Sequence, residues 1–198
     1  MRRMNKRVVH MVTIDGSVRL MRGQLKHLSN AGYEVTVISS PGKSLDKAKT
    51  EEKINIKPIK MERSISPLKD LYSLFKVLFY FIKLKPQICN SGTPKAGLLG
   101  MLASWITRVP LRIYTVRGLP FESEKGFKRK VLILTEKISC ACAHKVICIS
   151  PSLEKELHSY KITNKEKTLI FGKGSSNGLQ LSRFENNKKT KKIVSALE

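Results

Sequence analysis

Cationic residues and a glycine follow several strand-like segments, at the positions where parallel sheets usually bind ligands. Gly16, Lys95 and Arg117 each lie just beyond an apolar segment with the spacing of a buried strand. Glycine lets backbone amides approach a ligand closely, and lysine and arginine supply positive charge for phosphate oxygens. The pattern predicts a binding site for a phosphorylated or nucleotide-bearing molecule.

A glycine-rich segment near the end of the sequence has a different character. It reads Phe171-Gly-Lys-Gly-Ser-Ser-Asn-Gly178 and includes Lys173 and Asn177. Such a run is typical of a loop with positive φ angles and exposed amides, and we expect it to act as a hinge. The carboxyl ends of parallel strands meet at one edge of a sheet, so four loops should converge on one cleft there. These are residues 14–18, 90–95, 116–127 and 172–178.

Each of these residues also has a plainer interpretation. Gly16 could serve a tight turn, and Lys95 could be a solvated lysine in the first turn of a helix. Arg117 could form a structural ion pair instead of contacting a ligand. Asp15 could be a general base, but we favour an N-cap of the helix that follows it. His10 lies in an apolar segment, where a satisfied core histidine is the commoner arrangement.

The sequence lacks the usual metal and cofactor signatures. No phosphate-binding P-loop, dinucleotide fingerprint, serine nucleophile elbow or Asp-x-Asp pair is present. Cys140 and Cys142 flank only Ala141, and no second pair completes a zinc site. We therefore predict no metal and no cofactor, with Cys89, Cys140, Cys142 and Cys148 as reduced core residues, as suits a cytosolic protein.

Strand-like and helical segments alternate along the sequence. Ser-Pro or Thr-Pro pairs at 66–67, 93–94 and 150–151 predict helix starts, because proline needs no amide partner at the first helical position. The expected strands are 8–13, 33–39, 54–61, 87–90, 112–116, 145–149 and 168–171, and the expected helices include 18–31, 67–85 and 127–143, with 43–53 as a polar loop. Alternation of this kind predicts an α/β fold with a doubly wound, mostly parallel, Rossmann-like sheet.

The charge of the chain is strongly positive. It has 38 Lys plus Arg against 15 Asp plus Glu, a net charge of +23 over 198 residues. Such an excess calls for an anionic partner, since self-repulsion opposes compaction. Nucleic acid, anionic lipid and phosphorylated small molecules all qualify by charge alone. We do not expect nucleic acid, because the sequence has no recognition helix or aromatic-basic strand motif.

The segment 67–85 has an unusually wide apolar surface. Its polar side chains form one narrow stripe at helical spacing, made of Lys69, Ser73, Lys76, Tyr80 and Lys83. One face packed on a sheet needs an apolar arc of only about a third of the helix. The excess could contact an anionic bilayer, with the lysines on its headgroups. The alternative, which the sequence alone favours slightly, is a helix buried between the sheet and neighbouring helices.

Several motifs together resemble one known family. They are Val9-His-Met-Val-Thr-Ile-Asp-Gly-Ser17, Ala31-Gly-Tyr-Glu-Val-Thr-Val-Ile-Ser39, Asn90-Ser-Gly-Thr-Pro-Lys-Ala-Gly97, Tyr114-Thr-Val-Arg-Gly-Leu119, Lys125-Gly-Phe-Lys-Arg-Lys130, Cys148-Ile-Ser-Pro-Ser-Leu153 and Gly172-Lys-Gly-Ser-Ser-Asn-Gly178 with Phe184. From residue 7 to about 184 the chain resembles the N-terminal half of a GT-B glycosyltransferase of family 4. The nearest types are capsular polysaccharide and lipid-linked sugar transferases. In the hinge motif, Leu179-Gln180 replaces the family's apolar-Asp pair.

The resemblance implies transfer of a sugar from a nucleotide-sugar donor to a lipid-linked or polysaccharide acceptor, with retention of anomeric configuration and without a metal. Arg117 stands where many relatives carry a catalytic-site histidine, so its implied role is phosphate contact or acceptor orientation. By the same resemblance, residues divide between the two substrates: Asp15, Gly16 and Ser17 on the donor side, and Asn90, Thr93 and Lys95 on the acceptor side.

The resemblance also predicts the domain organisation. Residues 1–184 would form the N-terminal, acceptor-side domain, and residues 185–198 a tail or the beginning of a second domain. The family's Glu-x7-Glu motif of the donor-binding domain is absent, because no glutamate is followed by another eight positions later. We therefore expect a chain that is inactive alone, either truncated or awaiting a partner chain. The alternative is a non-catalytic remnant or acceptor-binding subunit that needs a separate donor-domain chain. The expected location is cytoplasmic, at the inner face of the membrane.

Overall fold

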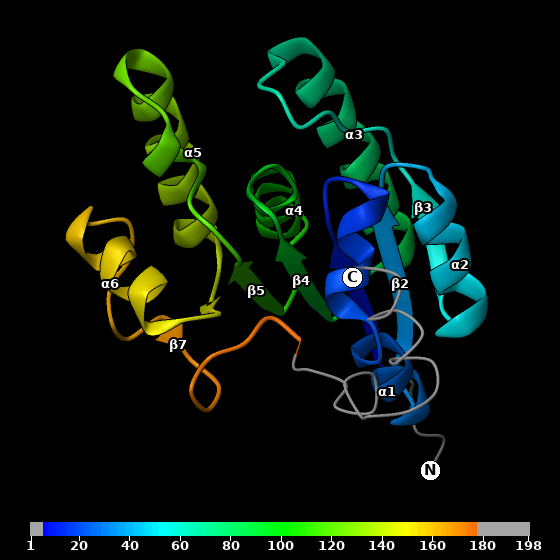
Figure 1. The fold of residues 1–198 in the computed structure, drawn as a ribbon. Helices are drawn as coiled ribbons and strands as arrows, with labels where there is room; N and C mark the ends of the chain where they lie inside the picture. The colour runs from blue at the N-terminus through cyan, green and yellow to red at the C-terminus, as the bar shows by residue number, and fades with distance from the viewer. Residues whose placement is uncertain (1–5, 178–198) are drawn as a thin grey trace, which may run out of the picture.

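The protein is built on a parallel β-sheet, seen in a computed structural model that describes residues 6–177 (Figure 1). The strand order is β3-β2-β1-β4-β5-β6-β7, and every neighbouring pair is parallel. The strands are β1 Arg7–Met11, β2 Glu34–Ser39, β3 Asn55–Pro58, β4 Ile88–Gly92, β5 Leu111–Val116, β6 Lys145–Cys148 and β7 Thr168–Leu169. The order reverses between β1 and β4, which creates a switch point where ligands bind in such sheets. The predicted doubly wound fold is confirmed.

Helices cover both faces of this sheet. They are α1 Gln24–Asn30, α2 Lys43–Glu51, α3 Pro67–Leu84, α4 Pro94–Ile106, α5 Gly126–Cys142 and α6 Pro151–Ser159, with the 3-10 helices η1 Asp15–Met21 and η2 Pro120–Ser123. Alternate residues of β2 enter different cores: Ile38 packs with α3 and α4, and Val37 packs with η1, α1 and α2. Figure 1 shows α3 and α5 projecting on the same side, with α4 between them.

The expected single helix 18–31 is two separate pieces. The 3-10 helix η1 ends at Met21, and α1 begins after Gly23, whose φ is +79°. The carboxylate of Glu52 accepts hydrogen bonds from the backbone N–H of Gly23 at 2.8 Å and of Lys26 at 2.9 Å. A residue 26 positions away from Lys26 thus satisfies the free amides at the beginning of α1, so the break is stable.

The polar segment 43–53, expected to be a loop, forms helix α2. Leu45 and Ala48 are buried on its inner face. Its amino end is held by the carboxylate of Asp15, which accepts from the backbone N–H of Ser44 at 3.2 Å. Gly42 leaves space for that carboxylate, since an added Cβ would lie 2.4 Å from Asp15 Oδ2. Two apolar residues in nine give a weak helical pattern, which explains why the sequence did not predict α2.

The prediction that helices begin at the Ser-Pro and Thr-Pro pairs is confirmed for α3, α4 and α6. Only one of the three hydroxyls acts as a cap: Ser150 accepts from the backbone N–H of Leu153 at 3.3 Å. The side chains of Ser66 and Thr93 make no capping hydrogen bond. At these two helices the proline, with its fixed φ, marks the first turn without help from the preceding side chain.

Helix α4 lies unusually close to the sheet. A Cβ on Gly97 would be 2.3 Å from the ring of Tyr114, and one on Gly100 would be 2.1 Å from Ser91 Oγ. Tyr114 is itself fixed, because its hydroxyl donates to the buried carboxylate of Glu136 at 2.8 Å. Burial raises the pKa of Glu136 to about 7. The four cysteines are free, three of them buried and Cys142 half-buried, as predicted.

Helix α3 differs from the arrangement that the sequence favoured. Ser73, Val77 and Phe81 are buried against the core. Six large apolar side chains are instead 50–84% exposed: Leu68, Leu71, Tyr72, Phe75, Phe79 and Ile82. The expectation of a helix buried on all sides is therefore wrong. Ser73 was wrongly placed on an outer polar stripe, because its hydroxyl points inward to the carbonyls of Lys60 at 3.0 Å and Lys69 at 2.9 Å.

Candidate functional site

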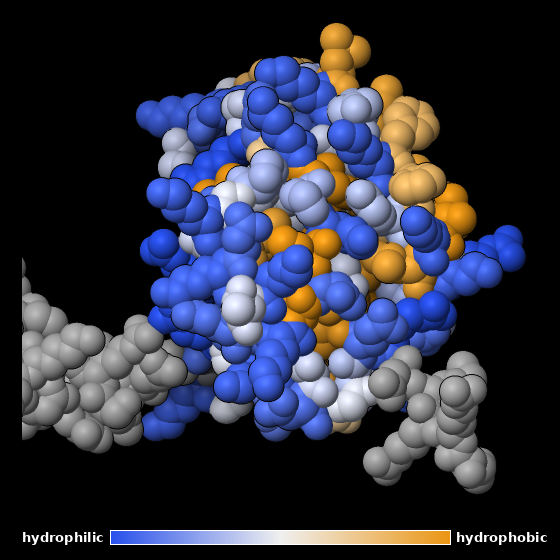
Figure 2. All heavy atoms as spheres, turned by 90° about the vertical axis from the view of Figure 1, so that its right-hand side faces the viewer, coloured by the Kyte–Doolittle hydropathy of each residue, from blue (hydrophilic) through white to orange (hydrophobic). Residues whose placement is uncertain are grey.

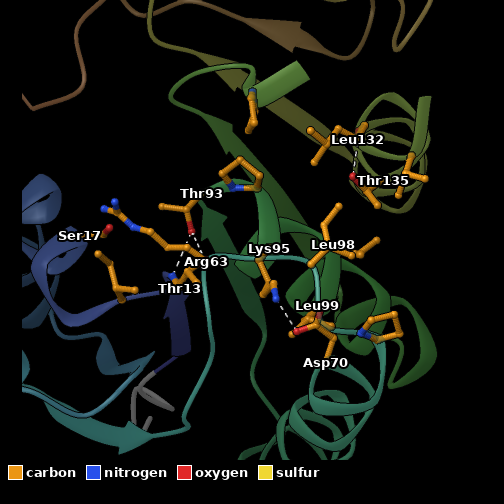
Figure 3. Close-up of a pocket in the computed structure, with 16 residues that line it drawn as sticks. Thr13, Ser17, Arg63, Asp70, Thr93, Lys95, Leu98, Leu99, Leu132 and Thr135 are labelled. Carbon is orange, nitrogen blue, oxygen red and sulfur yellow. Dashed lines mark hydrogen bonds and ion pairs between the residues drawn. The ribbon is translucent and has the colours of Figure 1, made fainter. Parts of the chain in front are cut away.

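A cavity of about 510 Å³ lies beside the amino end of α4, at the carboxyl edge of the sheet (Figure 3). Its wall comes from the loop after β1, the segment before and at the beginning of α3, the first turns of α4, η2 and the middle of α5. Most of the wall is apolar and includes Ile14, Ile65, Leu98, Leu99, Val131 and Leu132. Three of the four loops expected to converge there supply residues to this cavity.

Two threonines join the loop after β1 to α4. The hydroxyls of Thr13 and Thr93 lie 2.8 Å apart, and the backbone N–H of Thr13 donates to Thr93 Oγ1 at 3.0 Å. Thr13 Oγ1 also accepts from the backbone N–H of Ala96 at 3.2 Å. Thr13 therefore caps α4, although Thr93 is the residue that directly precedes the helix. Thr93 has φ of +99°, which is rare for a β-branched residue and is the kind of strain that gathers at functional sites.

Lys95 lines the cavity, as its predicted acceptor-side role requires, but its ammonium has protein partners. It donates to Asp70 Oδ1 and to the carbonyl of Ser64, each at 2.5 Å. The Lys95 and Asp70 side chains are only 10% and 21% exposed. The pair joins α4 to α3, and Asp70 offsets part of the lysine charge. Nothing in the sequence links positions 70 and 95, so this pairing could not be predicted.

Arg63 is a cavity residue that the sequence reasoning missed. It lies in the segment between β3 and α3, and its side chain extends toward Ser17 in Figure 3. Arg63 is exposed, so its guanidinium keeps contact with solvent. The one sequence signal was a basic residue between a predicted strand and a Ser-Pro helix start. Among the cavity residues, Arg63 is the cation that reaches furthest toward the predicted donor-side loop.

The donor-side loop is only partly directed at the cavity. Ser17 lines it. Gly16 has open space beside it, because a Cβ there would meet only Ile14 Cδ1, at 3.9 Å. Asp15 is turned away to the amino end of α2, where it accepts from Ser44. The interpretation of Asp15 as the N-cap of its own helix is wrong, since η1 has no side-chain cap.

Asn90 lies within the sheet and is not among the residues that line the cavity. Its Oδ1 accepts a hydrogen bond from the hydroxyl of Thr115 at 2.8 Å, which joins β4 to β5. Of the three predicted acceptor-side residues, the structure therefore brings Thr93 and Lys95 together and leaves Asn90 apart.

Arg117 connects the end of β5 to the glycine-rich segment. Its guanidinium donates to Ser176 Oγ at 2.5 Å and approaches the Ser176 carbonyl at 3.4 Å. Its buried Nε–H has no hydrogen-bond acceptor, and burial lowers the pKa of Arg117. Arg117 does not line the cavity. Its catalytic role stays a prediction, and the free Nε–H leaves one donor for an anion.

His10 is buried close to Arg117, and neither ring nitrogen has a hydrogen-bond partner. The expectation of a satisfied core histidine is therefore wrong. Burial, with the Arg117 charge as a smaller cause, lowers the pKa of His10 to about 4. The imidazole is neutral at physiological pH and carries no charge to the site.

As far as residue 177, the glycine-rich segment contacts distant parts of the described chain. Besides the Arg117 contact, Asn177 Nδ2 donates to the carbonyl of Arg22 at 3.1 Å. Gly174 has φ of +89°, and a Cβ there would lie 2.6 Å from the Ile149 carbonyl oxygen. Lys173 is exposed. Gly178, the rest of the predicted hinge motif and the proposed boundary at 184 and 185 lie outside the described residues.

Residues 6–177 contain no group of three or more His, Cys, Asp or Glu side chains placed to hold a metal ion. None of their helices combines the length and apolar character needed to cross a membrane. The predictions of no metal and no cofactor stay predictions.

Two curated proteins resemble the chain in sequence. It is 46% identical to the capsular polysaccharide biosynthesis glycosyltransferase CapM of Staphylococcus aureus over 186 residues, which are 93% of this chain and 48% of CapM. It is 34% identical to the UDP-Gal:alpha-D-GlcNAc-diphosphoundecaprenol alpha-1,3-galactosyltransferase of Escherichia coli over 88 residues, 44% of this chain and 23% of that protein. The chain thus spans about half the length of CapM, and its match to the second relative covers a smaller part.

A solved structure and a family profile complete the comparison. Anabaena HepE, in complex with UDP and glucose, has a TM-score of 0.68 at 14% identity, over 96% of this chain and 50% of HepE. At that identity the likeness shows the fold, that of one half of a GT-B protein. The profile of Glycosyltransferase Family 4 matches residues 14–171, which contain all the cavity residues except Thr13 and all the strands except β1. The chain therefore belongs to glycosyltransferase family 4.

Proposed function

We propose that the chain forms the acceptor-binding lobe of a glycosyltransferase that moves a sugar from a nucleotide-sugar to a lipid-linked or polysaccharide acceptor. The names of the two relatives support this: one is a capsular polysaccharide enzyme, and the other acts on a sugar carried by diphosphoundecaprenol. The chain spans about half the length of CapM, so the reaction of a complete two-lobe enzyme is itself proposed.

The observation that carries the proposal is the composition of the cavity wall. Arg63 provides positive charge, and Lys95 adds a charge that its partner Asp70 partly offsets. The amino end of α4 adds the positive end of a helix dipole, and most of the remaining wall is formed by apolar side chains such as leucine, isoleucine and valine. A lipid diphosphate sugar has the matching chemistry, with an anionic diphosphate beside an apolar chain. The cavity volume of about 510 Å³ is within the range of small-molecule sites.

The donor would approach from the side of Gly16 and Ser17. Open space beside Gly16 allows a phosphate group to come close to the backbone. Arg117 would contact a phosphate or orient the acceptor, the role that the family resemblance implies for its position. Cationic side chains can stabilise a leaving diphosphate without a metal ion, as the family resemblance implies. Retention of anomeric configuration rests on that resemblance alone.

We further propose that the chain is inactive alone and works with a separate donor-domain chain. Arg63 and Lys95 are the cations of the cavity wall, whereas departure of a nucleoside diphosphate requires charge on the opposite side of the cleft. The second candidate function is a non-catalytic acceptor-binding subunit. The cavity favours it as well, because the described residues of this one lobe supply lining residues from five segments of the chain.

Acceptor binding can be measured on the 198-residue chain without any transfer. We expect calorimetry to detect binding of farnesyl-diphospho-N-acetylglucosamine, a short-chain acceptor analogue. Arg63→Gln should weaken this binding about tenfold, because one charge-assisted hydrogen bond is lost. Arg108→Gln removes an exposed arginine that is not a cavity residue and is the matched control. Absent binding, or equal losses in both variants, would contradict the assigned cavity.

Transfer itself can be assayed with the second half of S. aureus CapM supplied as a separate chain. Radiolabelled UDP-sugars and the same acceptor analogue should give product only when both chains are present, and NMR of the product should show retention. Sustained transfer by the 198-residue chain alone would overturn the two-chain proposal. Acceptor binding without transfer under any combination would favour the binding-subunit function.

A further inference from the structure

The outer side of α3 is an apolar surface that the described fold does not cover. We call Leu68, Leu71, Tyr72, Phe75, Phe79 and Ile82 the α3 apolar face; all six are at least half exposed. They recur at spacings of three and four, so they lie along one side of the helix. Figure 2 views the molecule from the side on which α2, β3 and α3 lie in Figure 1. In this view, hydrophobic residues gather at the top and upper right, next to hydrophilic ones. Contiguous exposed apolar patches mark interaction sites.

A row of lysines borders this face. Lys69, Lys76 and Lys83 are exposed and recur every seven residues, which places them along one edge of the helix. The Lys76 ammonium lies 4.5 Å from the centre of the Tyr72 ring, beside the apolar surface. Lys69 pairs with Glu62 at 2.6 Å. The one acidic residue of α3, Asp70, faces inward to Lys95 and does not oppose the row.

We propose that the α3 apolar face docks the protein on the surface of an anionic lipid bilayer. Apolar side chains would enter the headgroup region, and the lysine row would contact lipid phosphates. The charge of the whole chain, +23, favours the same occupant. A second copy of this chain is a poorer fit, because pairing the faces would bring two lysine rows and two strongly positive chains together.

The beginning of α5 offers a second contact on the same side of the molecule. Phe127 is 82% exposed and is flanked by the exposed residues Lys125, Lys128 and Lys130. Figure 1 shows α5 and α3 projecting together beyond α4. The cavity draws residues from both, with Pro67 from α3 and Leu132 from α5. Docking through both helices would place the cavity next to the bilayer, so a lipid-linked molecule could enter without crossing water. Membrane binding itself does not depend on the proposed function.

Vesicle flotation of the 198-residue chain tests the proposal. We expect binding to phosphatidylcholine vesicles that contain about 30% phosphatidylglycerol at low salt, and much weaker binding to pure phosphatidylcholine or in high salt. Phe75→Ser and Phe79→Ser should each reduce the partition coefficient several-fold. Phe171→Ser, which alters an equally exposed phenylalanine away from α3, should leave it unchanged. Circular dichroism checks that all variants fold.

The lysine row has its own test, in which net charge is matched. Changing Lys69, Lys76 and Lys83 together to Glu should lower binding at least roughly tenfold, since each lysine near an anionic surface contributes substantially. Lys26, Lys49 and Lys155 are exposed elsewhere, and the same three changes there alter the net charge equally. Equal losses in both triple variants would overturn the docking surface, as would absence of vesicle binding at low salt. Sedimentation equilibrium tests the other occupant. If the chain self-associates, Phe75→Ser abolishes this self-association and no vesicle binding is seen, the α3 apolar face binds a second copy of the chain instead.

Discussion

Thr13 and Thr93, eighty positions apart in the chain, share a hydrogen bond of 2.8 Å between their hydroxyls at the edge of the cavity. Thr13 follows β1 and Thr93 precedes α4, so the contact joins the two central strands at the point where the strand order reverses. The loop that carries Gly16 and Ser17 is thereby held against the helix that carries Lys95. Predicted donor-side and acceptor-side residues are positioned by one pair of hydroxyls.

Thr13→Val should destabilise the protein by about 1–2 kcal/mol. The substitution keeps the shape but leaves the buried N–H of Ala96 without its acceptor, which is the loss of a helix cap. Urea unfolding measures the change. Thr50→Val, at an exposed helical threonine, is the control and should stay within about 0.5 kcal/mol. Equal effects would show that Thr13 does not cap α4.

Gly97→Ala should cost about 1–3 kcal/mol of unfolding free energy. The new methyl group would overlap the ring of Tyr114, and that ring cannot move away because its hydroxyl is held by Glu136. Gly118→Ala is matched, since a Cβ there meets nothing within 4 Å. Thermal unfolding of both variants separates the close helix-sheet contact from a general effect of removing glycine.

Glu136→Gln should change the pH dependence of stability. The folded-state pKa of about 7 lies above the ordinary 4.5, so the native protein loses stability as pH rises from about 4.5 to 7 and does not recover it above 7. The glutamine amide still accepts from Tyr114 but does not titrate. Relative to the parent chain, the variant should gain up to about 3 kcal/mol between pH 5 and pH 8. His10 titrates identically in both, so it cancels in the difference, and parallel curves from urea unfolding at each pH would contradict the assignment.

Gly174→Ala should release the segment 172–177 from the sheet edge. Its positive φ disfavours alanine, and the new methyl group would press against the Ile149 carbonyl oxygen at 2.6 Å. Gly172→Ala also meets a positive φ but has open space, so it isolates the backbone cost, about 1 kcal/mol. Faster hydrogen exchange at residues 174–177 in the first variant alone is the expected result. Equal exchange in the two would show that the close approach does not hold the loop.

The strands and helix starts could be predicted because each depends on local sequence. Buried parallel strands leave continuous apolar runs such as 8–13, and proline fixes the first turn of α3, α4 and α6. The carboxyl-edge position of Ser17, Thr93 and Lys95 follows from the same alternation of strands and helices. The sequence could therefore predict that these residues lie close to one cavity.

Contacts between distant residues explain what the sequence did not predict. The amino end of α2 depends on Asp15, and the beginning of α1 on Glu52, each at least 26 positions away. Asp70 neutralises part of Lys95 across 25 positions. Periodicity showed that α3 was too apolar for a single contact face, but it could not show which of its sides the sheet would cover.

The two edges of the α3 apolar face differ in charge. Lys69, Lys76 and Lys83, spaced seven residues apart, lie along one edge, and the opposite edge, with Leu71 and Leu78, carries no lysine. On a negatively charged surface, the lysine flank would stay level with the phosphates while the uncharged flank turned downward. The helix would then rest at a fixed roll about its long axis, and the spacing of three cations would set the angle at which the sheet edge meets the lipid.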